Sequence, residues 1–241
     1  LSWAQYNLAT GYLSLAESAL LAGHSPAEWT QKALLVAEQG IKQNPHSPLQ
    51  PLLLAVAHRY DAESLKGNPE AQSRSIELGQ ESVSLCDRLR PPFADCSLTA
   101  ARLLLLRAES DRRQHRSGAP WLTQAWNHLA QGLLIDGRNS ELFMLRAEVR
   151  RQQAQGSLPV IEEALREIDQ SLAIEPHAAQ AQWLRGQLLL ARAVVLPGPQ
   201  RSAEAARAVT ALASAEKQSP LLARHYAAEI AQAKRLAERG P

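Results

Sequence analysis

Apolar residues along this chain recur at the helical spacing of i, i+3, i+4 and i+7 rather than in the alternation typical of a β-strand. Leu8, Tyr12, Leu15 and Ala19 form one such series, and Leu184, Leu188 and Ala191 form another. The chain has only two Phe and four Tyr, and it contains no stretch of alternating β-branched residues. The pattern predicts an all-α protein.

Five helix-breaking residues divide the chain at similar intervals: Pro45, Pro91, Gly137, Pro176 and Pro220. Small residues lie twelve positions before each breaker: Ala33, Gly79, Ala125, Ala164 and Ala208. Small residues also lie five positions before each: Gly40, Cys86, Gly132, Ser171 and Ala215. The first four breakers are each followed, ten positions on, by a further small residue: Ala55, Ala101, Ala147 and Gly186. Small residues at a fixed register indicate close helix packing, and their repetition predicts a stacked helical array.

Each repeat also has a Gly- and Pro-containing break near its middle, which divides it into two helices. Gly suits the end of one helix, where a positive φ is needed, and Pro suits the first turn of the next. The first helices are expected at about 2–22, 48–65, 94–115, 140–155 and 178–195. Their partners are expected at about 27–43, 70–89, 121–135, 160–174 and 200–218. A last helix at about 221–238 carries charged residues that suit a solvent-facing cap.

We therefore expect one domain over residues 1–241, a right-handed α-superhelix of five helix pairs and a capping helix. Its units would be about 1–45, 46–91, 92–137, 138–176 and 177–220. The formal net charge of +2 does not indicate a nucleic-acid partner. No apolar run is long enough to cross a bilayer. The first residue is Leu1 and not Met, and no signal peptide is visible, so we interpret the chain as a piece of a longer protein.

The register resembles that of the tetratricopeptide repeat, a helix–turn–helix unit with three small positions and a closing Pro. Ala9, Ala55, Ala101, Ala147 and Gly186 match the small position of the first helix. The breakers lie 46, 46, 39 and 44 residues apart, against the usual 34, so the helices or their turn must be longer. The long units also resemble in style the repeats attached to certain bacterial serine/threonine protein kinases.

No catalytic or cofactor motif accompanies the repeats. A Gly-rich phosphate loop, a G-x-S-x-G elbow and an Asp-Phe-Gly triplet are all missing from the sequence, and the seven His lack metal-ligand spacing. His58-Arg59-Tyr60-Asp61 resembles a kinase catalytic loop only superficially, because it is expected in the middle of a helix. We expect no enzyme activity, metal or cofactor in this chain.

Cys86 and Cys96 lie five residues on either side of Pro91. An antiparallel turn there would bring them face to face, and a disulfide would then form in an oxidising compartment. Alternatively, Cys86 simply fills one of the small-residue positions, as free Cys often does.

The first helices of such arrays line a concave surface, which the resemblance implies is the binding groove. Aromatic and Arg side chains are favoured at interface hot spots. The candidate groove residues are Trp3, Tyr6, Asn7, Leu52, Val56, Arg59, Arg102, Met144, Arg151 and Trp183.

A basic group forms a second candidate: Arg107, Arg112, Arg113, Arg116, Arg146, Arg150 and Arg151. These residues would bind an acidic peptide or phosphate. The alternative is a solvated face balanced by Glu109, Asp111 and Glu148.

The sequence thus favours a non-catalytic module that binds a peptide or helix of a partner protein, as the regulatory or substrate-recruiting part of a larger protein such as a bacterial kinase. The alternative is a ligand-sensing domain with a small-molecule pocket between repeats. We expect a cytoplasmic location, or a periplasmic one if a membrane anchor lies elsewhere in the protein.

Overall fold

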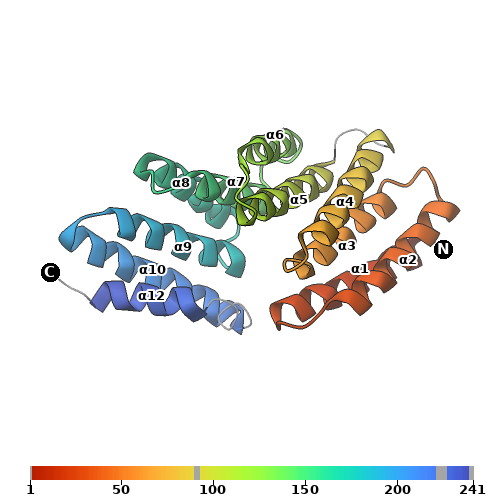
Figure 1. The fold of residues 1–241 in the computed structure, drawn as a ribbon. Coiled ribbons are helices and arrows are strands. Elements are labelled where there is room, and N and C mark those ends of the chain that lie inside the picture. Colours follow the sequence, from red (N-terminus) through yellow and green to blue (C-terminus); the bar gives the residue numbers. More distant parts are fainter. Residues whose placement is uncertain (1, 90–92, 221–226, 239–241) are drawn as a thin grey trace. The chain divides into compact units, whose positions relative to one another are not determined.

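The computed structural model describes residues 2–89, 93–220 and 227–238, and every regular element in these ranges is an α-helix (Figure 1). The described helices form two compact units, residues 1–137 and 138–241, which meet in the sequence at the third breaker, Gly137. The repeat period changes at the same point, because the breakers are 46 residues apart before it and 39 and 44 apart after it. We describe each unit by itself.

The first unit consists of three helix pairs. Its elements are α1 (Ser2–Leu21), α2 (Ala27–Gln43), α3 (Leu49–Ser64), α4 (Pro69–Leu89), α5 (Ala94–Arg113) and α6 (Ala119–Ile135). We call α1, α3 and α5 the A helices of this unit and α2, α4 and α6 its B helices. Each helix packs against the next, and α3 also packs against α1 and α5, so the pairs are stacked in chain order.

The second unit has two further pairs and an added helix. Its elements are α7 (Ser140–Gln153), α8 (Leu158–Ile174), α9 (Ala179–Val195), α10 (Gly198–Gln218) and α12 (Ala227–Glu238). Here α7 and α9 are the A helices, and α12 packs against α10. The predicted helix boundaries are confirmed to within a few residues, except that 221–226 lie outside the described residues.

The small residues of the register lie where neighbouring helices approach most closely. A Cβ built on Gly40 of α2 would lie 2.4 Å from Cδ of Gln50, on the A helix of the next repeat. A Cβ on Gly79 of α4 would lie 2.9 Å from both Cδ atoms of Leu103 on α5. Real Cβ atoms do not approach this closely, so a larger side chain would displace the buried side chain of Gln50 or Leu103. The prediction of close packing is confirmed at these positions.

Large apolar side chains fill the core of each unit. In the first unit, Ile76, Leu103 and Leu129 are fully buried. In the second, the same holds for Leu142, Ile168 and Leu212. The position eight residues before each breaker lies on a B helix and is buried in every repeat, which explains why it is always apolar. Its residues are Ala37, Val83, Leu129, Ile168 and Leu212.

Positive φ occurs at some of the mid-repeat turns, and not always at Gly. Gly23 and Gly156 have φ of 77° and 86°, as the sequence predicted for a Gly after a helix. In the third repeat the positive φ of 58° belongs to His115, whereas Gly118 has a φ of −83°. Gly118 is required for another reason, because a Cβ there would lie 2.8 Å from the carbonyl oxygen of Ala108.

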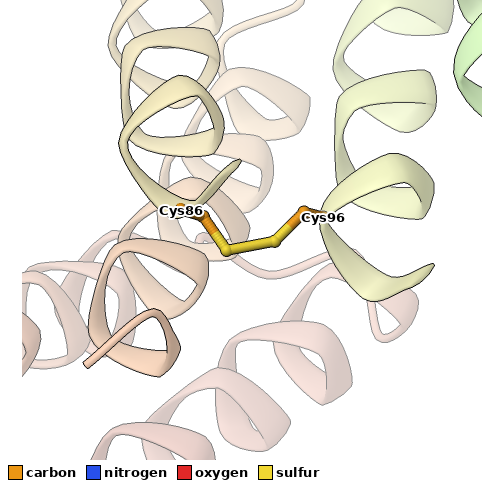
Figure 2. Close-up of a disulfide and its surroundings, with 2 residues drawn as sticks. All are labelled: Cys86 and Cys96. Carbon is orange, nitrogen blue, oxygen red and sulfur yellow. A yellow bond between two sulfur atoms is a disulfide. The ribbon is translucent and has the colours of Figure 1, made fainter. Parts of the chain in front are cut away.

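A disulfide joins Cys86 near the end of α4 to Cys96 near the start of α5, with Cα atoms 6.8 Å apart (Figure 2). Both cysteines are buried, with 1% and 0% of their surface exposed. They belong to a core cluster that also includes Ile76, Val83 and Leu103. Cys86 therefore occupies the small-residue position of its repeat and is bonded across the repeat boundary, and it is not the free Cys of the second alternative.

We predict that reduction lowers the free energy of unfolding of the oxidised protein by about 2–3 kcal/mol, because the bridge closes a short loop in the unfolded chain. Urea unfolding with and without reductant measures the difference. Alkylation of the unfolded protein without reductant, followed by measurement of the intact mass, should modify neither cysteine. A variant with both cysteines replaced by Ala should not respond to reductant, and two alkylated thiols in the parent would contradict the bridge.

We also predict that Ala125→Leu lowers the free energy of unfolding by about 1–3 kcal/mol, because this residue is fully buried between helices and the added volume cannot be accommodated without strain. Chemical denaturation followed by circular dichroism measures the loss. Ala130→Leu, at an exposed position of the same helix, is the matched control and should change stability little. Equal stability of the two variants would contradict the register.

Candidate interaction surface

The three A helices of the first unit present one shared row of surface positions, because the repeat offset of 46 residues places equivalent residues at the same point of each helix. Side chains three or four residues apart lie on one face of a helix. We define the A-helix face by these residues: Trp3, Tyr6, Thr10 and Glu17 of α1, Leu49, Leu52, Val56, Arg59 and Glu63 of α3, and Asp95, Leu98, Arg102, Leu105 and Glu109 of α5.

The middle of the A-helix face is accessible. Thr10 is exposed, and Val56 and Arg102, its equivalents on α3 and α5, are half-buried. At one end Trp3 is 70% exposed, and its ring meets that of the half-buried Tyr6 edge-on, with centroids 5.9 Å apart. These five residues include four of the predicted groove residues, and an indole with so much exposed surface is an anchor available to a partner.

The other end of the A-helix face carries a row of three carboxylates that our sequence analysis missed. Glu17, Glu63 and Glu109 are 46 residues apart, and each is half-buried. The signal was present in the sequence, since the register that located the small residues also aligns these three. Together with the half-buried Arg102, the row gives this face charges of both signs.

Charges from all three A helices converge around Tyr60, which is 6% exposed. Burial raises the pKa of its hydroxyl, Arg59 and Arg102 lower it, and Glu17 and Glu63 raise it further. The net result is a pKa above the ordinary value, so the hydroxyl stays protonated at neutral pH. Glu17 lies on α1 and Arg102 on α5, so this cluster ties the A helices together electrostatically.

Arg59 is buried, which corrects its predicted role as an accessible groove residue. It is 7% exposed, its Nη1 donates to Oε1 of Glu63 at 2.6 Å, and its guanidinium lies 3.9 Å from the centre of the Tyr60 ring. Burial lowers the pKa of Arg59, but Glu63, Tyr60 and Glu17 together raise it above its ordinary value. Arg59 thus stabilises the fold under the A-helix face instead of contacting a ligand.

Three further predicted groove residues are also buried. Leu52 and Met144 are each 8% exposed, and Trp183 is 4% exposed. With Leu98 they share one register position, three residues before the small residue of the A helix. Consecutive A helices pack against each other in both units, so this position is enclosed by the neighbouring helices. Accessible aromatic surface is therefore provided by Trp3 and Tyr6 and not by Trp183.

The remaining predicted residues lie apart. Asn7 is exposed on α1, beside the A-helix face. Arg151 belongs to the second unit, where its Nε and Nη2 donate to the two carboxylate oxygens of Glu148 at 2.7 and 2.8 Å. Seven of the ten candidates belong to the first unit and three to the second, so we base the site on the first unit.

Five of the seven Arg of the basic group pair with carboxylates, which supports the alternative of a balanced face. Arg116 pairs with Asp111 at 2.6 Å and Arg151 with Glu148 at 2.7 Å. The other partners are on B helices and were not predicted. Arg107 binds Ser73 and Glu77, Arg146 pairs with Glu167 at 2.7 Å, and Arg150 pairs with Glu163 at 3.1 Å.

Asp111 stabilises the turn between α5 and α6. The residue is 7% exposed, and its carboxylate accepts hydrogen bonds from Trp121 Nε1 at 2.7 Å and from Arg116 at 2.6 Å. Burial raises the pKa of Asp111, but these two hydrogen bonds and the charges of Arg116 and Arg107 outweigh it, so the pKa lies below its ordinary value.

Two hollows lie outside the A-helix face. One, of about 350 Å³, is lined by α4 residues that include Glu77, Glu81 and Arg88. The other, of about 530 Å³, lies in the second unit and is lined by Leu165, Asp169, Arg185, Leu189, Arg192, Arg207 and Thr210. In the described ranges, no group of three or more His, Cys, Asp or Glu is arranged to hold a metal ion. No described helix is both long and apolar enough to span a bilayer.

Comparison with known proteins gives a likeness of fold. No protein-family model matches the chain. No curated protein matches it either. Among solved structures, the chain is similar to a thermophilic TPR protein of Thermus thermophilus, with a TM-score of 0.64 and 19% sequence identity over 92% of this chain and 99% of that chain. At this identity the likeness shows the fold alone, and it confirms the prediction of an all-α tetratricopeptide-like repeat architecture.

We predict that Asp111→Asn lowers the free energy of unfolding at pH 7 by about 1–3 kcal/mol, because Trp121 and Arg116 lose a buried, charged acceptor. A carboxylate with a depressed pKa contributes stability above its unfolded pKa of about 3.9 and loses it as the pH falls through the folded pKa. The parent should therefore lose more stability than the variant between neutral and acid pH. Urea unfolding over this range measures both curves, and parallel curves would contradict the assignment.

Proposed function

We propose that this chain is a non-catalytic protein-interaction module, and that the A-helix face of the first unit binds a peptide segment or helix of a partner. The observation that carries the proposal is the row of accessible side chains contributed by three successive helices over a closely packed core. Trp3 and Tyr6 supply an aromatic anchor, Val56 supplies apolar surface, and Arg102 supplies donors. This combination is typical of interface hot spots.

The dimensions of the face favour a short ligand. Packed helices are about 8–10 Å apart, so three A helices span about 20 Å. An extended peptide rises about 3.3 Å per residue, which makes six residues sufficient to contact all three helices. Glu17, Glu63 and Glu109 line one edge of the face, so we expect the ligand to place a basic side chain or its amino terminus there.

Within this proposal, the chain is the regulatory or substrate-recruiting region of a larger protein. The style of its long repeats supports attachment to a bacterial serine/threonine protein kinase. The module would then act in the cytoplasm, or in the periplasm if the larger protein carries it across the membrane. The buried disulfide favours the periplasmic alternative, since disulfides persist in oxidising compartments.

A ligand-sensing domain is the second candidate, and the hollow of about 530 Å³ in the second unit supports it. Arg185, Arg192 and Arg207 border this hollow and would favour an anionic small molecule. All three already bind carboxylates, since Arg185 pairs with Asp169 and the other two pair with Glu204. An anion would have to compete with these pairs, so we favour the protein-interaction proposal.

The test uses peptides selected from a random display library against the complete chain. We predict that Arg102→Ala weakens binding of the selected peptides about 5- to 30-fold, as expected for an interface anchor worth about 1–2 kcal/mol. Added salt should weaken parent binding further, because exposed charges are screened. Fluorescence anisotropy with a labelled peptide measures the affinity.

Arg88→Ala is the matched control, because Arg88 is an exposed Arg on a B helix and should not affect binding. Circular dichroism verifies that both variants fold. If Arg102→Ala binds like the parent while Arg88→Ala loses affinity, the ligand binds on the B helices and the proposal for the A-helix face is wrong.

A further inference from the structure

The side of α1 opposite its packed side is an apolar surface that no described residue covers. Ala9, Leu13 and Ala16 of α1 are buried in a core cluster with residues of α2 and α3. On the opposite side, five exposed residues alternate between small and large at spacings of four and three: Ala4, Leu8, Gly11, Leu15 and Ser18. We call these five residues the outer face of α1. Leu8 and Leu15 are 48% and 45% exposed.

The outer face carries no charge. The first charged residue of the chain is Glu17, and the helical period places it on the A-helix face and away from the outer face. The Ser18 hydroxyl donates to the carbonyl oxygen of Ser14 at 2.9 Å, so it can be covered without losing a hydrogen bond. The outer face is therefore prepared for burial against another apolar surface.

The outer face differs from the equivalent surfaces inside the repeats. The position of Gly11 is occupied in the later A helices by Ala57, Leu103, Val149 and Leu188, all buried. The position of Leu15 is occupied there by polar or charged residues: Asp61, Arg107, Gln153 and Arg192. α1 thus has Gly where three of the other A helices bury a large residue and α3 buries Ala, and it has Leu where the others are polar or charged.

Gly11 lacks a reason within the chain. A Cβ built on it would meet no atom within 4 Å, and no positive φ is found there. Gly in the middle of an exposed helix destabilises that helix relative to Ala. A close approach by an element outside the chain would explain why the backbone is bare at this point.

We propose that the outer face of α1 binds the outer face of a second copy of this chain, with the two helices antiparallel. The face is self-complementary. With a two-fold axis beside residue 13, Leu15 of one copy lies against Gly11 of the second copy, and Leu8 lies against Ser18 of the second copy. Each Leu then enters a space above a small residue, which is how antiparallel helices pack when their backbones approach closely.

The size of the contact sets its strength. One helix of 20 residues is about 30 Å long, and such a contact buries less than the roughly 800 Å² per partner of a standard interface. The dimer is therefore expected to be weak and reversible. The inference goes beyond the proposed function, because the A-helix face lies on a different side of α1 and stays open in the dimer.

Sedimentation equilibrium of the complete chain, from micromolar to submillimolar concentration, tests the proposal. The average mass of the parent should rise toward that of two chains. Leu8→Glu combined with Leu15→Glu should stay monomeric throughout, because buried carboxylates would face an apolar surface. Leu35→Glu, at an exposed Leu of α2, is the matched control and should dimerise like the parent. Circular dichroism verifies that both variants are folded.

Cross-linking tests the register. Leu8→Cys combined with Ser18→Cys places thiols ten residues apart, about 15 Å along one helix, too far for a bridge within a chain. Oxidation should therefore give covalent dimers, whereas Glu28→Cys combined with Glu38→Cys, at exposed positions of α2 with the same spacing, should not. A parent that stays monomeric, a Leu8/Leu15 double variant that dimerises like the parent, or equal cross-linking of both cysteine pairs would overturn the proposal.

Discussion

The close approach of neighbouring helices at small residues is the constraint on which the rest of the structure depends. Gly40 faces the side chain of Gln50 and Gly79 faces that of Leu103, in both cases without room for a methyl group. Each small residue therefore leaves the space that a buried side chain of the neighbouring helix fills. The packed helices determine which side chains are enclosed and which are exposed to another molecule.

The helix packing also determines which Arg side chains reach a carboxylate on a neighbouring helix. Arg107, Arg146 and Arg150 extend from A helices to carboxylates on B helices. These pairs are partly exposed, so each contributes little to stability, yet each reduces the net attraction of the surface for anions. Most of the basic group that the sequence offered as a binding site is therefore paired with carboxylates in the structure. The A-helix face of the first unit, where Arg59 also pairs with Glu63, is proposed as the binding surface because Trp3 is exposed there.

The helices and their stacking could be predicted because breakers and small residues act locally or at a fixed spacing. The accessibility of the candidate groove residues could be predicted only in part. Leu52 and Trp183 occupy the right register, but consecutive A helices are near enough to enclose them, and sequence periodicity does not reveal that distance. The same holds for Arg107, whose partner Ser73 lies 34 residues away. The division after Gly137 was not predicted, since the repeat pattern continues through it.

Gly186 has a consequence for the engineering of such repeats. Its register position is occupied by Ala in the other four repeats. A Cβ there would lie 2.6 Å from two side-chain atoms of Leu212, a fully buried residue of α10. A consensus repeat, built from the commonest residue at each position, would therefore introduce a steric clash into this unit. The repeats share a pattern but are fitted individually, so they are not interchangeable modules.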